Sequence, residues 1–218
     1  MISTENQWNN KKQQFIKLWP SENPAQIENI WDILTTHYSE SSRFYHTKQH
    51  ILDCLQHYED IKKYLTSSDA VQMSIWFHDI IYDIKATDNE EKSAAFFAQI
   101  AKNILSREFI DTVKELIIST KHKKPPPNCD QAFLVDIDLS SFGSTWEKFI
   151  QDGEKLRKEA PHLTEKQFND NKISFFQMLL SRKKIFFTDY FHDRYELVAH
   201  KNIALQTQKI LNADKTLN

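Results

Sequence analysis

Apolar side chains recur every three or four positions along most of the chain, which is the spacing that one face of an α-helix turns toward a core. The segment 69–82 is apolar almost all round, which is typical of a helix in the centre of a bundle. The sequence predicts an all-α bundle of about nine or ten helices. The segments expected to be helical or buried are 5–20, 24–34, 47–64, 69–82, 88–100, 106–120, 131–138, 145–158, 165–181 and 192–212.

Several polar and proline-containing sequences mark the expected helix ends. Asn23-Pro24 supplies an N-cap followed by a first-turn proline, and Ser106 is a second N-cap candidate. Asp88 and Glu91 have the spacing of a capping box, with Asp in place of Ser or Thr. The segment 121–128 (KHKKPPPN) is the clearest break, and 142–144 predicts a turn and a new N-cap. We expect one domain over 1–218, with an N-terminal helix at about 5–20 and C-terminal helices at about 145–212 packing on the core.

The composition excludes several classes of function. Only 2 of the 218 residues are glycine, too few for a glycine-rich phosphate loop or a dinucleotide-binding turn. The formal charge of −2 gives no strong sign of nucleic-acid binding. Two cysteines, Cys54 and Cys129, are too few for a disulfide scaffold. With no signal-peptide pattern and no apolar run of membrane-spanning length, we expect a cytoplasmic protein without a membrane partner.

Histidine and aspartate form three patterns of chemical interest. His46 and His50 are four residues apart and share a face if the helix begins by His46. His78-Asp79 is expected inside the apolar helix 69–82. Asp136 and Asp138 lie in the buried segment 131–138 and cannot both face the same way in a helix.

Each pattern has an ordinary structural explanation. A histidine pair on a helix is usually solvated. His78-Asp79 has two ordinary explanations, a structural hydrogen bond between the two side chains or an aspartate at a helix end that faces water. His78-Asp79 is harder to explain in this way, because a buried carboxylate costs several kcal/mol unless it is paired or binds a metal. Adjacent side chains on a helix diverge by about 100°, so a metal ion bridges such a pair more easily than a direct contact does.

Taken together, the ordered set His, His-Asp, Asp resembles the signature of the HD superfamily of metal-dependent phosphohydrolases. The fuller pattern is similar to one uncharacterised bacterial family of HD-type hydrolases. The resemblance covers about 43–205 and implies an HD-domain-like helical bundle. Its recurring segments are 43–51, 76–82, 88–94, 136–143 and, near the C-terminus, Ile185, Glu196 and Asn202.

The resemblance implies a set of site residues. The metal ligands fall on His50, His78, Asp79 and Asp138. His50 is preferred to His46 because the segment 45–50 is similar to one in cyclic-nucleotide phosphodiesterases, in which the second histidine binds metal and the first donates a proton. Asp138 is preferred to Asp136 because the related deoxynucleotide triphosphohydrolases use the second Asp of an Asp-x-Asp.

This ligand set suits a divalent ion (Mn, Fe, Ni, Co, Mg or Zn), which would polarise a phosphate and activate water. His46 is the expected general acid. Arg43 is the expected phosphate contact, with a plain surface arginine as the equal alternative. Glu90 or Glu91 is a candidate to orient a ligand, although capping alone explains Glu91.

Two further histidines are expected to lie outside the site. His122 follows a helix end among lysines, and a solvated loop is narrowly favoured over a phosphate-steering patch or an extra metal ligand. His192-Asp193 repeats the dipeptide in polar surroundings and is interpreted as the start of a helix with acidic residues in its first turn.

The main hypothesis is a metal-dependent phosphohydrolase acting on a small phosphorylated molecule, such as a nucleotide or phosphate ester. The alternatives are a non-catalytic module that binds a nucleotide or a partner on the same scaffold, and a purely structural helical protein.

Overall fold

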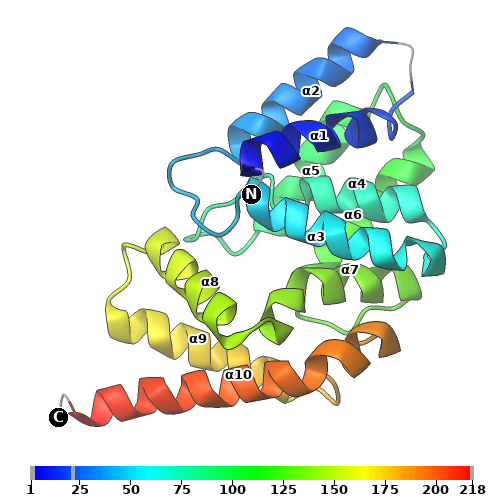
Figure 1. The fold of residues 1–218 in the computed structure, drawn as a ribbon. Helices are drawn as coiled ribbons and strands as arrows, with labels where there is room; N and C mark the ends of the chain where they lie inside the picture. Colours follow the sequence, from blue (N-terminus) through cyan, green and yellow to red (C-terminus); the bar gives the residue numbers. More distant parts are fainter. Residues whose placement is uncertain (1–2, 21–22, 217–218) are drawn as a thin grey trace. The chain divides into compact units, whose positions relative to one another are not determined.

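The computed structural model describes residues 3–20 and 23–216, and the described residues form helices without any β-strand. The all-α prediction of about ten helices is therefore confirmed (Figure 1). The α-helices are α1 (Thr4–Ile16), α2 (Pro24–His37), α3 (Lys48–Ile61), α4 (Ser68–Phe77), α5 (Asn89–Ala101), α6 (Arg107–Ser119), α7 (Cys129–Leu139), α8 (Trp146–Glu159), α9 (Glu165–Leu180) and α10 (Asp189–Thr216), with short 3-10 helices η1 (Lys62–Tyr64) and η2 (Ser140–Gly143).

The chain divides into two compact units, Met1–Ile137 and Asp138–Asn218. The division falls inside α7, so one continuous helix connects the first unit to the second. The expectation of one domain over 1–218 stays a prediction.

An aromatic core holds the first unit together. Trp8 of α1 is fully buried, and its ring stacks on Trp31 of α2 at 5.0 Å and meets the edge of Trp76 of α4 at 5.3 Å. Phe15, two turns further along α1, packs against both Trp31 and Trp76. Burial of such large rings is the main contribution to stability here, and it fixes α4 as the central helix of the unit.

The predicted helix starts are mostly observed. The side chains of Asn23 and Ser106 accept hydrogen bonds from the backbone of Gln26 and Phe109, and Pro24 opens α2. The capping box at Asp88 is wrong, because Asp88 makes no side-chain cap bond to the backbone of α5. Its carboxylate instead forms an ion pair with the ammonium of Lys92, 2.7 Å away.

The second unit is built around the close approach of η2 to α10. A Cβ on Gly143 would collide with the side chain of Tyr195, so only glycine fits at this point. Asn202 donates hydrogen bonds of 2.9 Å to the carbonyls of Phe142 and Ser144, which holds the turn on α10. The turn predicted at 142–144 is thus observed, although the N-cap of α8 is Thr145 rather than Ser144.

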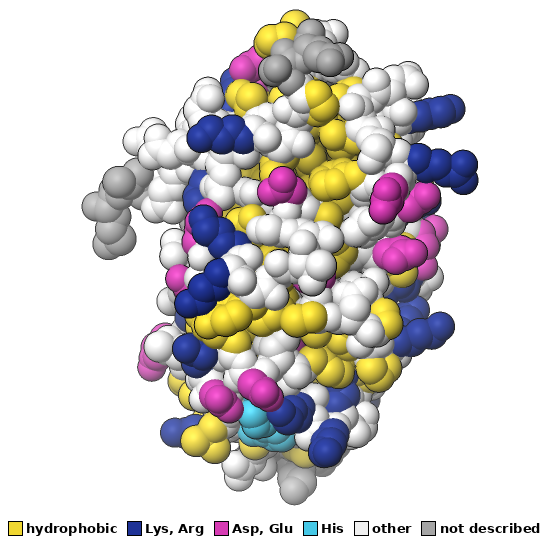
Figure 2. All heavy atoms as spheres, turned by 90° about the vertical axis from the view of Figure 1, so that its right-hand side faces the viewer, with side chains coloured by type: hydrophobic (Ala, Val, Ile, Leu, Met, Phe, Trp, Pro, Cys, Tyr) yellow, Lys and Arg dark blue, Asp and Glu magenta, His cyan; other side chains and the backbone are white. Residues whose placement is uncertain are grey.

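The surface carries mixed charges. On the face drawn in Figure 2, basic and acidic side chains alternate with apolar ones, in keeping with the formal charge of −2. Within the described part of the chain, none of the helices combines the length and the apolar character that crossing a bilayer needs.

Candidate metal centre

The His78-Asp79 pair lies at the end of a helix rather than inside one. We expected a helix over 69–82, but α4 ends at Phe77, His78 is its C-cap residue, and Asp79 follows in a turn. The divergence expected of neighbouring helical side chains therefore does not apply. His78 Nε2 lies 3.1 Å from Asp79 Oδ2, so the expectation that a direct pair is awkward is wrong.

His50 of α3 completes a tight group with these two residues. Its Nε2 lies 3.2 Å from His78 Nε2 and 3.4 Å from Asp79 Oδ2. His50 is 6 % exposed and His78 1 % exposed, whereas Asp79 is half-buried. We call His50, His78 and Asp79 the histidine–aspartate site. The structure thus brings together three residues of the predicted ligand set within the first unit.

The backbone of α4 fixes the orientation of the His78 ring. His78 Nδ1 lies 2.9 Å from the carbonyl oxygen of Ile75, and because a carbonyl only accepts, Nδ1 carries the proton. Nε2 faces His50 and Asp79, and the proton with which it bonds to the Asp79 carboxylate is the one that metal binding would displace, leaving a lone pair on Nε2. Metal-binding histidines are usually held in this way by a carbonyl or carboxylate on the other nitrogen.

Arg43 holds the turn that carries Asp79. Its guanidinium donates to the backbone carbonyls of Asp79 at 2.6 Å and Ile80 at 2.8 Å, and to the carboxylate of Glu40 at 2.9 Å. Arg43 is 5 % exposed, so the surface alternative is wrong. Because the guanidinium is buried and bonded to the protein, the geometry favours a positioning role over the phosphate contact expected from sequence.

Electrostatics keep Asp79 ionised. Burial raises the pKa of its carboxyl, but the charges of the His78 and His46 imidazoles and hydrogen bonds from His50 and His78 outweigh burial, so the pKa lies well below its ordinary value. Burial and the nearby Asp79 carboxylate raise the pKa of Tyr38. Tyr38 therefore stays neutral, and its hydroxyl donates to the carbonyl of Trp76 in the last turn of α4.

His46 lies beside the site but not on the helix of His50. The helix begins at Lys48 with Thr47 as N-cap, so the condition for His46 and His50 to share a helical face is not met. The two rings are nevertheless 6.0 Å apart between centroids. His46 stacks on the ring of Tyr82 at 3.9 Å and is half-buried, which leaves part of it accessible to water.

Helix α7 is tied to the start of α4. The carboxylate of Asp130, in the first turn of α7, accepts hydrogen bonds from the backbone N–H groups of Thr66 and Ser67, at 2.8 and 2.7 Å. Asp138 lies two turns further along the same helix. Within the first unit, His50, Cys54 and His78 form a group whose ligand atoms all lie within 4.8 Å of one another. Asp136, which is fully buried, is not in this group.

Cys54 is the member of this group that the sequence analysis missed. It lies one turn after His50 on α3 and is 2 % exposed, and its sulfur lies 3.8 Å from His50 Nε2. The signal in the sequence was the spacing His-x-x-x-Cys on a helix, which puts both side chains on one face.

The spacing of these atoms fits a divalent metal ion. At metal–nitrogen distances of about 2.0–2.1 Å, two ligands of a tetrahedral ion lie about 3.3–3.4 Å apart. The three separations in the histidine–aspartate site are 3.1, 3.2 and 3.4 Å. Two imidazoles and a carboxylate are also a common donor set for divalent first-row metals. The residues of the first unit could therefore hold such an ion.

The remaining candidates lie in other surroundings. His122 is buried, so the solvated loop predicted for it is wrong. Lys121 next to it pairs with Glu91 and, at 3.5 Å, with Glu90. His192 lies in the first turns of α10, as the sequence predicted for a helix start.

No family model, no curated protein and no solved structure matches this chain.

Proposed function

We propose that this protein is a metal-dependent phosphohydrolase that acts on a small phosphorylated molecule such as a nucleotide or phosphate ester. The observation that carries the proposal is the convergence of His50, His78 and Asp79 from separate parts of the first unit, at separations that suit one ion. The order of these residues and of Asp138 along the chain, which resembles that of the HD superfamily, supports the same assignment.

In this proposal His50, His78 and Asp79 hold a divalent cation, and the resemblance to the HD superfamily adds Asp138 as a fourth ligand. Such an ion supplies a Lewis acid that draws electron density from a phosphate oxygen and lowers the pKa of water. The protein's own contribution is to present two imidazole nitrogens and the ionised carboxylate of Asp79 at fixed positions. Two interactions keep these groups in position: the hydrogen bond from His78 Nδ1 to the carbonyl of Ile75, and the hydrogen bond from Arg43 to the carbonyl of Asp79.

His46 is the proposed proton donor to the leaving oxygen. Its ring is half-buried, lies within 6.0 Å of the His50 ring and is held against Tyr82 by stacking. An imidazole can carry a proton to a leaving oxygen and take it back from water, which suits a group that must give up a proton during each turnover.

The test is a comparison of ligand variants with an exposed histidine as control. We expect His78→Ala and Asp79→Ala to lose bound metal and to abolish metal-supplemented hydrolysis of generic phosphoesters and a nucleotide panel. His200→Ala, on the solvent side of α10, should retain both. The measurements are metal content by elemental analysis, phosphate release, and helical content by circular dichroism.

Full metal retention in both ligand variants would contradict the proposal. Tight nucleotide binding without turnover under any of the metals tested would instead favour the non-catalytic binding module.

A further inference from the structure

Cys54 is buried on the same side of α3 as His50. The other buried side chains of this helix include Ile51, Leu55 and Tyr58, which contribute to the core, but the Cys54 sulfur lies against the His50 ring, 3.9 Å from Nδ1 and 3.8 Å from Nε2. Cys54 therefore faces the same group of ring nitrogens as the histidine–aspartate site.

The distances fit a coordinating sulfur. With a metal–sulfur bond of about 2.3 Å and a metal–nitrogen bond of about 2.0–2.1 Å, a tetrahedral ion places sulfur and nitrogen about 3.6 Å apart. The observed 3.8 Å is close to this value. All pairs of ligand atoms among His50, Cys54 and His78 lie within 4.8 Å.

We propose that Cys54 is a ligand of the metal centre, and that its sulfur makes the site select a thiophilic divalent ion such as zinc or iron over magnesium. The inference rests on the proposed function in that it requires a metal at His50 and His78. On metal binding the thiol gives its proton to solvent and the thiolate forms the bond to the ion. Thiolate ligands favour zinc and iron, whereas magnesium prefers oxygen ligands and retains its water.

The chain offers a clean test, because its only other cysteine, Cys129, is exposed and lies at the start of α7. The metal-free full chain is titrated with cobalt(II), which reports thiolate ligation through a sulfur-to-cobalt charge-transfer band in the near ultraviolet and total binding through its visible d–d bands. We expect the charge-transfer band in the wild type and in Cys129→Ser. We expect it to be absent in Cys54→Ser, while the d–d bands persist.

Metal affinity gives a second readout. We expect Cys54→Ser to bind zinc about 100-fold more weakly than the wild type, with a much smaller change for magnesium. If Cys54→Ser does not fold, the band in Cys129→Ser still identifies the ligand, because Cys54 is then the only thiol in the chain.

The outcomes separate this inference from the proposed function. Cobalt d–d bands without a charge-transfer band in the wild type would overturn the role of Cys54 and leave the metal centre intact. A charge-transfer band that persists in Cys54→Ser would also overturn it. An absence of any cobalt binding would overturn both the ligand and the metal centre.

Discussion

Two regions of the molecule combine a pair of histidines with one carboxylate, but only one of them brings these groups together as a candidate ligand set. In the first unit, the histidine–aspartate site gathers side chains from α3 and from the end of α4. In the second unit, His192, Glu196 and His200 lie along one face of α10 at successive four-residue spacings; we call them the α10 row.

The difference lies in what else the carboxylate and the imidazoles contact. Both oxygens of Glu196 accept backbone N–H bonds, from Ile185 at 2.9 Å and Phe186 at 3.0 Å, so this carboxylate holds the loop before α10 in place. The His200 side chain is 49 % exposed and stays hydrated. The same residue types therefore make a loop anchor in one unit and a candidate ligand set in the other.

The arginines of the two regions give the largest expected contrast. We expect Arg43→Ala to lower the free energy of unfolding by about 3 kcal/mol, because the buried carbonyls of Asp79 and Ile80 lose their donors. Metal affinity should fall by about 10- to 100-fold, since Asp79 loses its support. Urea unfolding and metal titration measure the two effects.

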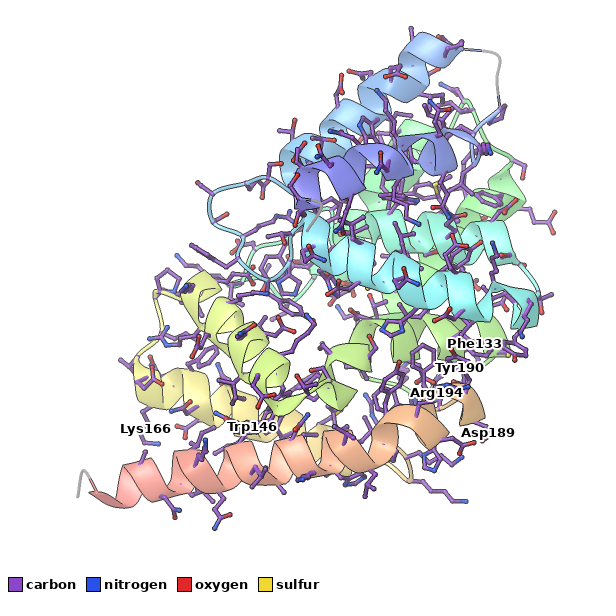
Figure 3. All side chains as sticks on the ribbon, in the orientation of Figure 1. Phe133, Trp146, Lys166, Asp189, Tyr190 and Arg194 are labelled. Atoms are coloured by element: carbon purple, nitrogen blue, oxygen red, sulfur yellow. The ribbon has the colours of Figure 1, made fainter. Side chains whose placement is uncertain are left out.

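Arg194 is the matched control. Its guanidinium lies 3.8 Å from the centroid of the Tyr190 ring at the start of α10 (Figure 3), and the residue is exposed. Arg194→Ala should cost less than about 1 kcal/mol, as exposed cation–π contacts do, and should leave metal binding unchanged. Equal losses of stability in Arg43→Ala and Arg194→Ala would show that burial of the arginine does not decide how much it contributes to the free energy of unfolding.

Replacing the anchoring carboxylate is expected to have an intermediate and pH-dependent effect. Burial raises the pKa of Glu196, but hydrogen bonds from the N–H groups of Ile185 and Phe186 and the His200 imidazole outweigh it, so the pKa is lowered on folding. Such a group stabilises the fold above its ordinary pKa, and that contribution is lost as pH falls through the lowered value.

Glu196→Gln should therefore reduce the free energy of unfolding by about 1 kcal/mol at neutral pH. The difference from the wild type should shrink as the pH is lowered toward the folded pKa of Glu196. Urea unfolding at a series of pH values tests this, and a difference that grows on acidification would contradict the assignment.

The smallest effect is expected at His200, the most exposed residue of the α10 row. His200→Gln should change stability by no more than about 0.5 kcal/mol, because an exposed ion pair on a helix contributes little. Thermal unfolding of this variant beside the wild type provides the check. A loss of several kcal/mol would mean that the α10 row stabilises the second unit as strongly as the histidine–aspartate site stabilises the first.

The fold was predictable because it follows from local patterns. The apolar periodicity of α1–α6, the N-caps at Asn23 and Ser106 and the break after Lys121 all act through neighbouring residues, and the structure confirms them. Asp88 shows the limit of such patterns, because its side chain pairs with Lys92 instead of capping α5.

The site was predictable in its residues but less so in its geometry. The apolar run through Ile80 indicated a helix, yet bonds from Arg43 to the carbonyls of Asp79 and Ile80 replace helical ones there. These bonds join residues more than 30 positions apart, and no local propensity reports them. Cys54 was expected on the buried face of its helix but not as a ligand, since a buried cysteine on an apolar face ordinarily contributes only to packing.

The position at which α4 ends has one more consequence. The peptide dipoles of this helix add up along its axis and leave a partial negative charge at the C-terminal end, where His78 follows Phe77. A cation bound between His50 and His78 would therefore sit against the electronegative end of a buried helix. The main chain itself would attract the ion, and no substitution of a ligand side chain would remove that part of the attraction.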